Sequence, residues 1–277
     1  MSHRARLALA LALAAAPGAA LAQTAEPAVG VRASAELGFL FVADHFVRFG
    51  VDGSRIDYRR DGAQDNLYPF VRLSAEIDVR RRHHVTLLYQ PLEIVSRETL
   101  TRDLRIDGVT FPNGTPVQFR YGFPFFRAGW HYDLLAAPDR EFSLGLALQL
   151  RNATIDFESL DGRLFRGRSD VGVVPLLRAR GRFPLGSAGA FFAFEVDGFY
   201  APISVLNGSD NEVTGALVDA SLKLGLQLPL KSEAFLNVRY ITGGATGQSD
   251  PEAFSDGKTR NWLQFMTVSL GANISSF

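Results

Sequence analysis

The stretch ALVDASLKLGLQL at residues 216–228 decides the fold class. Seven apolar residues occupy every second position from Ala216 to Leu228, and Asp219, Ser221 and Lys223 fall between them. Strict alternation is the period of a β-strand, because successive side chains of a strand point to opposite faces. A helix would instead place its apolar residues three or four positions apart. The stretch therefore predicts a strand with one apolar face and one polar face.

The same alternation recurs in nine other segments. It is clear in 67–80, 142–150, 171–183, 190–200 and 234–240, and weaker in 33–48, 84–97, 117–135 and 258–277. Within 117–135 the apolar face switches at Phe125–Phe126, which predicts a β-bulge at that point. We expect ten strands.

The first 22 residues have the features of a secretory signal peptide. Arg4 and Arg6 precede an unbroken apolar run over 7–16, and the Ala-Leu-Ala at 20–22 is a small-residue cleavage site. Residues 23–32 would then form a short periplasmic segment, and residues 33–277 the folded domain. After residue 22 no apolar run approaches the roughly 18 residues of a membrane-spanning helix, which excludes a helical membrane protein.

Composition excludes several function classes. Lys plus Arg and Asp plus Glu both number 29, so no basic excess favours nucleic acid. The chain has no cysteine, which excludes a disulfide scaffold, a thiol nucleophile and a lipid-anchored cysteine. It also lacks a phosphate-binding loop, a Gly-x-Ser-x-Gly motif and a His-Glu-x-x-His motif. We therefore expect no cofactor and no metal.

The connections between the ten segments alternate in length. The long ones cover 49–66, 98–116, 156–163, 207–212 and 243–257, and the short ones 81–83, 136–140, 184–188 and 229–231. Long outer loops and tight periplasmic turns are typical of an up-and-down barrel in the outer membrane. A soluble β-sandwich, the alternative fold, does not predict this regularity. Aromatic residues lie near the predicted strand ends, as in an interfacial girdle: Tyr121, Tyr200, Tyr240 and Trp262 on the outer side, and Trp130, Tyr132, Phe142 and Phe277 on the periplasmic side.

The signal peptide, the alternating strands and the terminal Phe277 together resemble a Gram-negative outer-membrane β-barrel protein of the small up-and-down class. The resemblance covers 33–277 and implies an all-β fold, a single closed antiparallel transmembrane barrel of about ten strands. It also implies outer-membrane lipid, lipopolysaccharide and the barrel-assembly machinery as partners, and it leaves any extracellular ligand open. One departure from that class is that Val268, Leu270 and Ile274 are out of phase with Phe277.

If the apolar faces meet lipid, the other faces line the lumen. The charges expected to face inward are nearly balanced, with eight acidic and nine basic residues. Those singled out as lumen candidates are Arg72, Glu76, Arg120, Arg127, Arg178, Arg180, Glu195, Asp197, Asp219, Lys223 and Arg239. Charges held away from water must be paired, so we predict an ion-pair network that plugs the lumen. The protein would then have a structural or surface-interaction role. The alternative is a narrow, anion-preferring channel walled by Arg178, Arg180 and Arg182.

Two histidines are candidates for catalysis. His131 is predicted to face inward with Asp133 two residues away, and His45 to face lipid beside Asp44 near the outer end of the first strand. Neither has a positioned nucleophile, and neither matches the constellations of the ten-stranded omptin proteases or the lipid A deacylases. We therefore predict that the chain is not an enzyme. A hydrolase acting on lipid A or peptides is the less favoured alternative.

The outer loops carry mixed charge. Arg55, Arg59, Arg60, Arg102 and Arg105 are candidates for contact with lipopolysaccharide phosphates. The competing interpretation is an ordinary solvated loop surface, since loops carry charge for solubility. His83 and His84 follow Arg80, Arg81 and Arg82 in a short turn, which we interpret as a solvated basic turn.

Overall fold

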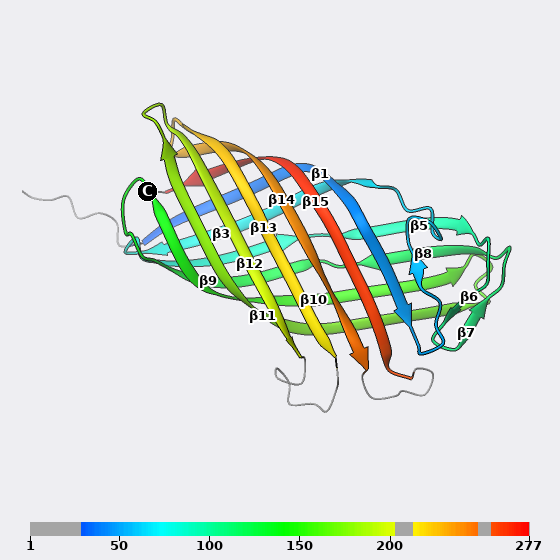
Figure 1. Cartoon of the computed structure of the whole chain (residues 1–277). Helices are drawn as coiled ribbons and strands as arrows, with labels where there is room; N and C mark the ends of the chain where they lie inside the picture. The colour runs from blue at the N-terminus through cyan, green and yellow to red at the C-terminus, as the bar shows by residue number, and fades with distance from the viewer. Residues whose placement is uncertain (1–28, 203–212, 249–255, 277) are drawn as a thin grey trace, which may run out of the picture.

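The chain folds into a closed antiparallel barrel of ten strands (Figure 1). We call each of the ten a wall, because two of them are divided into two shorter strands. A computed structural model describes residues 29–202, 213–248 and 256–276. The sheet closes where β15 pairs with β1, with Leu37 opposite Leu270. The uninterrupted walls are β1 (Val29–Phe49), β3 (Leu67–Val79), β10 (Glu141–Ser159), β11 (Phe165–Leu185), β12 (Ala190–Pro202), β13 (Thr214–Leu228), β14 (Ser232–Gln248) and β15 (Lys258–Ser275). The predicted all-β barrel is confirmed.

The other two walls are each interrupted next to a proline. The third wall consists of β4 (His83–Gln90) and β5 (Glu93–Thr99), and the fourth of β8 (Pro116–Gly122) and β9 (Phe125–Asp133). Proline has no N–H to donate to the ladder, which accounts for breaks at Pro91 and Pro124.

The register does not shift across the break in the fourth wall. Gly122 lies opposite Thr154 and Phe125 opposite Arg151, so three residues on one strand match three on the other. The predicted bulge at Phe125–Phe126 is therefore wrong. The same face points inward throughout, and its chemistry changes from apolar at Phe119 and Tyr121 to charged at Arg127.

The two ends of the barrel differ. The turns 80–82, 134–140, 186–189 and 229–231 lie at the end that holds the start of β1 and the end of β15 (Figure 1). In outer-membrane barrels this is the periplasmic end. β1 begins at Val29, inside the segment predicted to precede the barrel. The predicted signal peptide and Phe277 lie outside the described residues.

At the extracellular end, two segments close the mouth of the barrel. We call them the cap: residues 50–66, which contain β2 (Ile56–Asp57), and residues 100–115, which contain the hairpin β6 (Leu104–Ile106) and β7 (Val109–Phe111). By contrast, β10 and β11 are joined by residues 160–164 alone. Half of the loop predicted at 156–163 is strand, because β10 continues to Ser159, with Ile155 and Phe157 buried inside the barrel.

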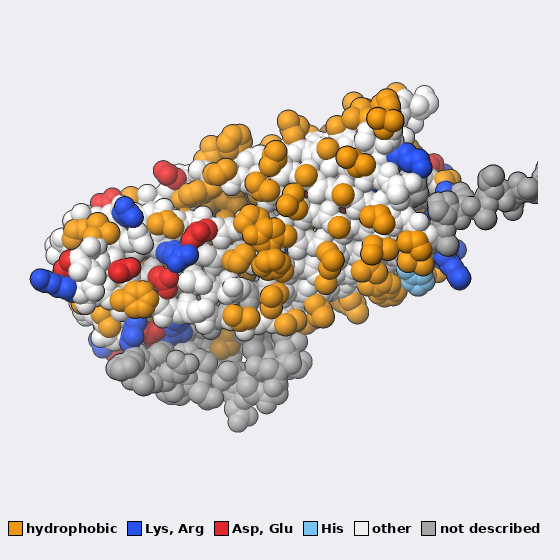
Figure 2. Space-filling model, turned by 180° about the vertical axis from the view of Figure 1, so that it is seen from behind, with side chains coloured by type: hydrophobic (Ala, Val, Ile, Leu, Met, Phe, Trp, Pro, Cys, Tyr) orange, Lys and Arg blue, Asp and Glu red, His pale blue; other side chains and the backbone are white. Residues whose placement is uncertain are grey.

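The outer surface of the barrel is apolar around its middle (Figure 2). Leu37 and Phe39 of β1, Leu177 of β11 and Leu270 of β15 are each 60% or more exposed. An apolar belt of this extent on a soluble protein would cause aggregation, whereas in a barrel it faces lipid. Among the described residues, no helix is long and apolar enough to cross a bilayer.

Candidate functional site

The periplasmic half of the lumen is filled by a layer of paired charges. The charged layer comprises Glu36, Arg72, Arg127, Arg178, Glu195, Asp197, Asp219, Lys223 and Arg239. At its centre, Asp219 accepts hydrogen bonds from Arg127 at 2.9 Å and from Arg239 at 2.5 Å. Arg239 is 1% exposed, so these charges are shielded from bulk water. Burial without such pairing would be strongly unfavourable.

Each strand supplies its charges through the alternation read from the sequence. Asp197 of β12 lies opposite Arg178 of β11 in the register and receives two hydrogen bonds from it, at 2.7 and 3.0 Å. It is also in contact with Arg127 of β9. Cross-strand pairs thus extend into cross-lumen pairs, and the layer connects walls that are not neighbours.

The charged layer leaves little free space. A cavity of about 80 Å³ lies against it, lined by Glu36, Arg72, Arg178, Arg180 and Lys223 among others. Since a water molecule occupies about 30 Å³ of liquid, this space holds two or three waters. Among the described residues, the paired charges thus narrow this part of the lumen.

The extracellular half of the lumen is apolar. A cluster of buried side chains fills it from the wall and the cap, including Tyr58, Phe111, Phe119, Phe157 and Phe265. The cap is fixed to the barrel rim by Asp107, which accepts hydrogen bonds from the Arg168 guanidinium of β11 at 2.7 and 2.8 Å.

An apolar cavity of about 560 Å³ lies beside this cluster. Its lining includes Phe125 and Phe265, and small residues such as Gly215, Gly243 and Ala245 of β13 and β14 enlarge it. Gln149 also lines the cavity and accepts hydrogen bonds from Arg127 at 2.5 and 3.1 Å. The charged layer is therefore the floor of the apolar cavity. A volume of this size matches pockets for small organic ligands.

The wall beside the apolar cavity is incompletely paired. β11 and β12 form a ladder from Leu185↔Ala190 to Leu177↔Gly198, and pairing stops there. Beyond this point β11 continues to Phe165 against β10, and β12 continues to Pro202 against β13. Figure 1 shows the two strands running together at the periplasmic end and diverging toward the extracellular side.

The cavity extends around the free edge of β11. Its lining includes Gly172 and Val174, on the inward face of β11, and also Val171 and Val173, which are exposed on the outward face. A closed wall would separate these two faces. The cavity therefore reaches the space outside the barrel between β11 and β12, a place we call the lateral opening.

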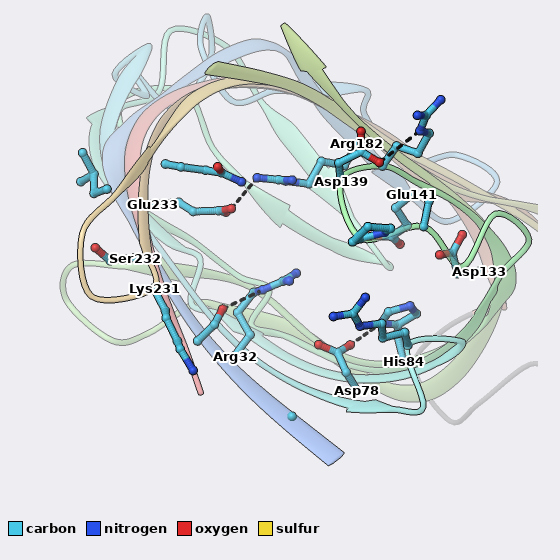
Figure 3. Close-up of a pocket in the computed structure, with 18 residues that line it drawn as sticks. Arg32, Asp78, His84, Asp133, Asp139, Glu141, Arg182, Lys231, Ser232 and Glu233 are labelled. Carbon is cyan, nitrogen blue, oxygen red and sulfur yellow. Dashed lines mark hydrogen bonds and ion pairs between the residues drawn. The ribbon is translucent and has the colours of Figure 1, made fainter. Parts of the chain in front are cut away.

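A second, polar cavity lies at the periplasmic end. This vestibule has a volume of about 390 Å³, and Figure 3 shows Arg32, Asp78, His84, Glu141 and Glu233 around it. Below the charged layer, Arg180 donates hydrogen bonds to Glu141 at 2.7 and 3.0 Å and is paired with Glu76. Arg182, predicted as part of an arginine wall, donates to Glu233 at 2.5 Å. The three arginines predicted to form a wall, Arg178, Arg180 and Arg182, are thus paired with carboxylates.

The structure places most of the predicted lumen residues inside the barrel, and Arg120 outside it. Arg120 is exposed and paired with Glu93 of β5 at 2.7 Å. The prediction for Arg120 is wrong because the apolar face of this strand, with Phe119 and Tyr121, packs inward against the cap. For the same reason Tyr121 is buried and not part of an interfacial girdle, whereas Tyr200 and Trp130 are exposed.

His45 also faces inward, which corrects its predicted lipid-facing position. The register of β1 against β15 shifts between Val42 and Asp44, and this bulge reverses the facing of the residues that follow. The His45 ring is buried, stacks on Tyr58 at 3.9 Å and hydrogen-bonds through Nδ1 to Gln64 Oε1 at 2.6 Å.

The sequence suggested a pair between His131 and Asp133, but the structure does not show this pair. Asp133 instead accepts backbone hydrogen bonds from Leu135, Ala136 and Phe142 and so shapes its turn. His131 is buried opposite His84 in the β4–β9 register, and the two rings stack with centroids 4.8 Å apart. His84 is thus buried rather than part of a solvated turn; sequence spacing of 47 residues gave no sign of this pair.

The candidate loop arginines lie on the cap and mostly make local contacts. Arg102 donates to Asp61 at 3.1 and 2.8 Å, and Arg60 lies 3.5 Å from the same carboxylate. Burial raises the pKa of Asp61, but the hydrogen bonds from Arg102, from the Asp57 backbone and from Arg60, together with the Arg102 charge, hold that pKa below its ordinary value. Arg55 stacks over Phe46, Arg59 donates to the Ala43 carbonyl and Arg105 lies 3.8 Å from Asp52. Contact with lipopolysaccharide stays a prediction.

Comparisons with known proteins show a likeness in fold alone. No protein-family model matches the chain, and no curated protein matches it. The chain is similar to the outer membrane protease OmpT from Escherichia coli, with a TM-score of 0.51 and 11% identity over 89% of this chain and 96% of OmpT. A weaker likeness, with a TM-score of 0.30 and 8% identity over 90% of each chain, is to the toluene transporter TodX of Pseudomonas putida.

The protein is thus an outer-membrane β-barrel of the Gram-negative type in fold. At this level of identity the likeness to OmpT concerns the arrangement of strands and not the chemistry.

Proposed function

We propose that this protein is a plugged, non-enzymatic barrel of the outer membrane that binds an apolar molecule in its extracellular half. The ligand enters from the surrounding lipid through the lateral opening between β11 and β12. The observation that carries the proposal is the apolar cavity of about 560 Å³, whose lining wraps around the unpaired edge of β11. An apolar ligand gains about 25 cal/mol for each Å² removed from water.

The position of the cavity favours binding over conduction. The cap covers the extracellular mouth, and the charged layer closes the lumen below Gln149. The lateral opening is the remaining route in the described part of the chain. An anion-preferring channel, the alternative, would need free arginines, whereas Arg178 and Arg180 are paired with Asp197, Glu76 and Glu141.

The rim of the cavity bears a few polar groups. Arg168, Thr259 and Asn261 line it toward the extracellular side. A ligand with a long apolar part and a small polar end would place that end among them, as polar groups fix orientation in otherwise apolar pockets. The acyl chain of an outer-leaflet lipid and a free apolar compound share the apolar part of this chemistry.

The test is binding of the fluorescent apolar probe N-phenyl-1-naphthylamine to the folded barrel in detergent micelles. Gly172→Phe should weaken binding at least tenfold, because a Cβ at Gly172 meets no atom within 4 Å and the ring would fill the cavity. Leu224→Phe, on the exposed face of β13, is the matched control and should leave binding unchanged. Equal binding by the two variants would refute the proposal. Displacement of the probe by dodecanoate and by toluene, in separate titrations, distinguishes the two ligand sources.

A further inference from the structure

The periplasmic vestibule contains a cluster of buried groups that the apolar cavity does not involve. His84 and His131 face each other across neighbouring strands β4 and β9, and Glu141 reaches them from β10. Candidate ligand atoms of these three residues all lie within 4.8 Å of one another. His131 Nε2 is 3.7 Å from Glu141 Oε1.

Three of the four ring nitrogens have no hydrogen-bond partner among the residues that the structure describes. His131 is fully buried, and neither its Nδ1 nor its Nε2 has a partner in the described part of the chain; His84 Nε2 also lacks one. Buried polar atoms without partners are rare in native proteins and call for a water, an ion or a catalytic role. The fourth nitrogen, His84 Nδ1, is in contact with the Asp78 carboxylate.

The charges around the two rings point to a cation. Asp78 is buried, and among the described residues its ion-pair partner is His84 and no arginine or lysine. The neighbouring carboxylates of Glu76 and Glu141 are paired with Arg180, and Glu76 also with Arg32. With neutral imidazoles, the cluster holds three carboxylates against two guanidinium groups.

We infer that this cluster binds a divalent transition metal of the zinc type. The ligands would be His84 Nε2, one ring nitrogen of His131 and the Glu141 carboxylate. Two imidazoles and a carboxylate form a common zinc ligand set. Asp78 is then the carboxylate that orients a metal-bound histidine through its other ring nitrogen.

The geometry requires an adjustment in which one imidazole turns, because the lone pairs of the two stacked rings lie in nearly parallel planes and must converge on the ion. Zinc–ligand distances near 2.1 Å put tetrahedral ligand atoms about 3.4 Å apart, so the three groups would close by about 1 Å. Glu141 also accepts two hydrogen bonds from Arg180 and one from Ser143, which leaves one of its roughly four lone-pair sites, on Oε2, for a metal. His84 and Glu141 line the vestibule (Figure 3), whereas His131 lies fully buried behind them, so an ion would enter from the vestibule side. The site is thus reachable from the periplasm.

The experiment measures zinc bound to the refolded barrel after removal of free metal, by mass spectrometry. Wild type should retain about one zinc per chain, and His131→Gln should retain none. Asp78→Asn should bind 10- to 100-fold more weakly, the usual effect of removing an orienting carboxylate. His83→Gln is the matched control, since His83 is the adjacent exposed residue and should retain zinc.

A second measurement covers the case in which His131→Gln does not fold, as judged by its migration on an unheated gel. Wild type loaded with Co²⁺ should show the strong visible absorption of a tetrahedral site. A weak spectrum like that of aqueous Co²⁺, or equal zinc in wild type and a folded His131→Gln barrel, would overturn the inference.

Discussion

Replacing Asp219 by Asn removes the central acceptor of the charged layer. Asp219 accepts from Arg239 at 2.5 Å and Arg127 at 2.9 Å, and Arg72 Nη1 lies 3.8 Å away. Each direct charged hydrogen bond contributes about 1.5–3 kcal/mol. Removing one partner of a buried pair also leaves its cations uncompensated, at a typical total of about 3–5 kcal/mol. The free energy of unfolding should therefore fall by about 3–5 kcal/mol.

The assay is urea-induced unfolding in lipid vesicles, followed by tryptophan fluorescence and by the gel-mobility shift between folded and unfolded barrel. Glu93→Gln is the control, because its pair with Arg120 is about half exposed on each side and should contribute at most about 1 kcal/mol. If Asp219→Asn cost no more than Glu93→Gln, the layer would be hydrated and the plug would not be structural.

Other predictions concern the lumen, the wall and the cap. Wild type in a planar bilayer should show no discrete conductance steps, because the charged layer leaves only about 80 Å³ beside it; steps with an ion preference would restore the channel hypothesis. The chain has no cysteine, so pairs of introduced cysteines report directly which strands are in contact. Ala179→Cys with Val196→Cys should form a disulfide, since the two residues are paired in the β11–β12 ladder. Pro175→Cys with Tyr200→Cys, at the equivalent position past the end of that ladder, should not form one. Equal disulfide yields would mean that the lateral opening is closed. The Asp61–Arg102 pair should stabilise the cap fully at pH values above 3.8, the ordinary pKa of the carboxyl group. This stabilisation should be lost as the pH falls through the lowered pKa of Asp61 in the folded state, because protonation removes the hydrogen-bond acceptor. Hydrogen exchange of residues 50–66 should accordingly lose protection in acid, and Asp61→Asn should lose it at neutral pH; protection that is independent of both changes would contradict this role.

The sequence predicts the barrel well because alternation and loop length are local signals. The segment 216–228 lies within β13, and its polar positions Asp219 and Lys223 face the lumen as expected. Paired charges were also predictable, since inward charges in a narrow barrel must be neutralised. Individual partners were not predictable, because the pairing of Arg127 with Asp219 depends on geometry across the lumen.

The predicted facing of residues in the extracellular half was wrong for a physical reason. Alternation identifies an apolar face but not whether that face meets lipid or a protein core. In the fourth wall, Phe119 and Tyr121 pack inward under the cap, so Arg120 faces outward. The bulge in β1 that turns His45 inward carries no local sequence signal strong enough to place it. The end of the β11–β12 ladder is a property of two strands separated by a turn, and neither strand reveals it alone.

The contrast between the two halves of the lumen bears on whether the ligand passes through or stays. An apolar molecule in the cavity lies above Gln149 and Arg127. To reach the vestibule it would have to separate pairs such as Arg127–Asp219 and Arg178–Asp197 and leave buried charges beside an apolar surface. Breaking a single buried pair already costs several kcal/mol, which opposes passage far more than return through the lateral opening. If the proposed ligand binds, we therefore expect it to return to the outer leaflet through the lateral opening rather than pass to the periplasm.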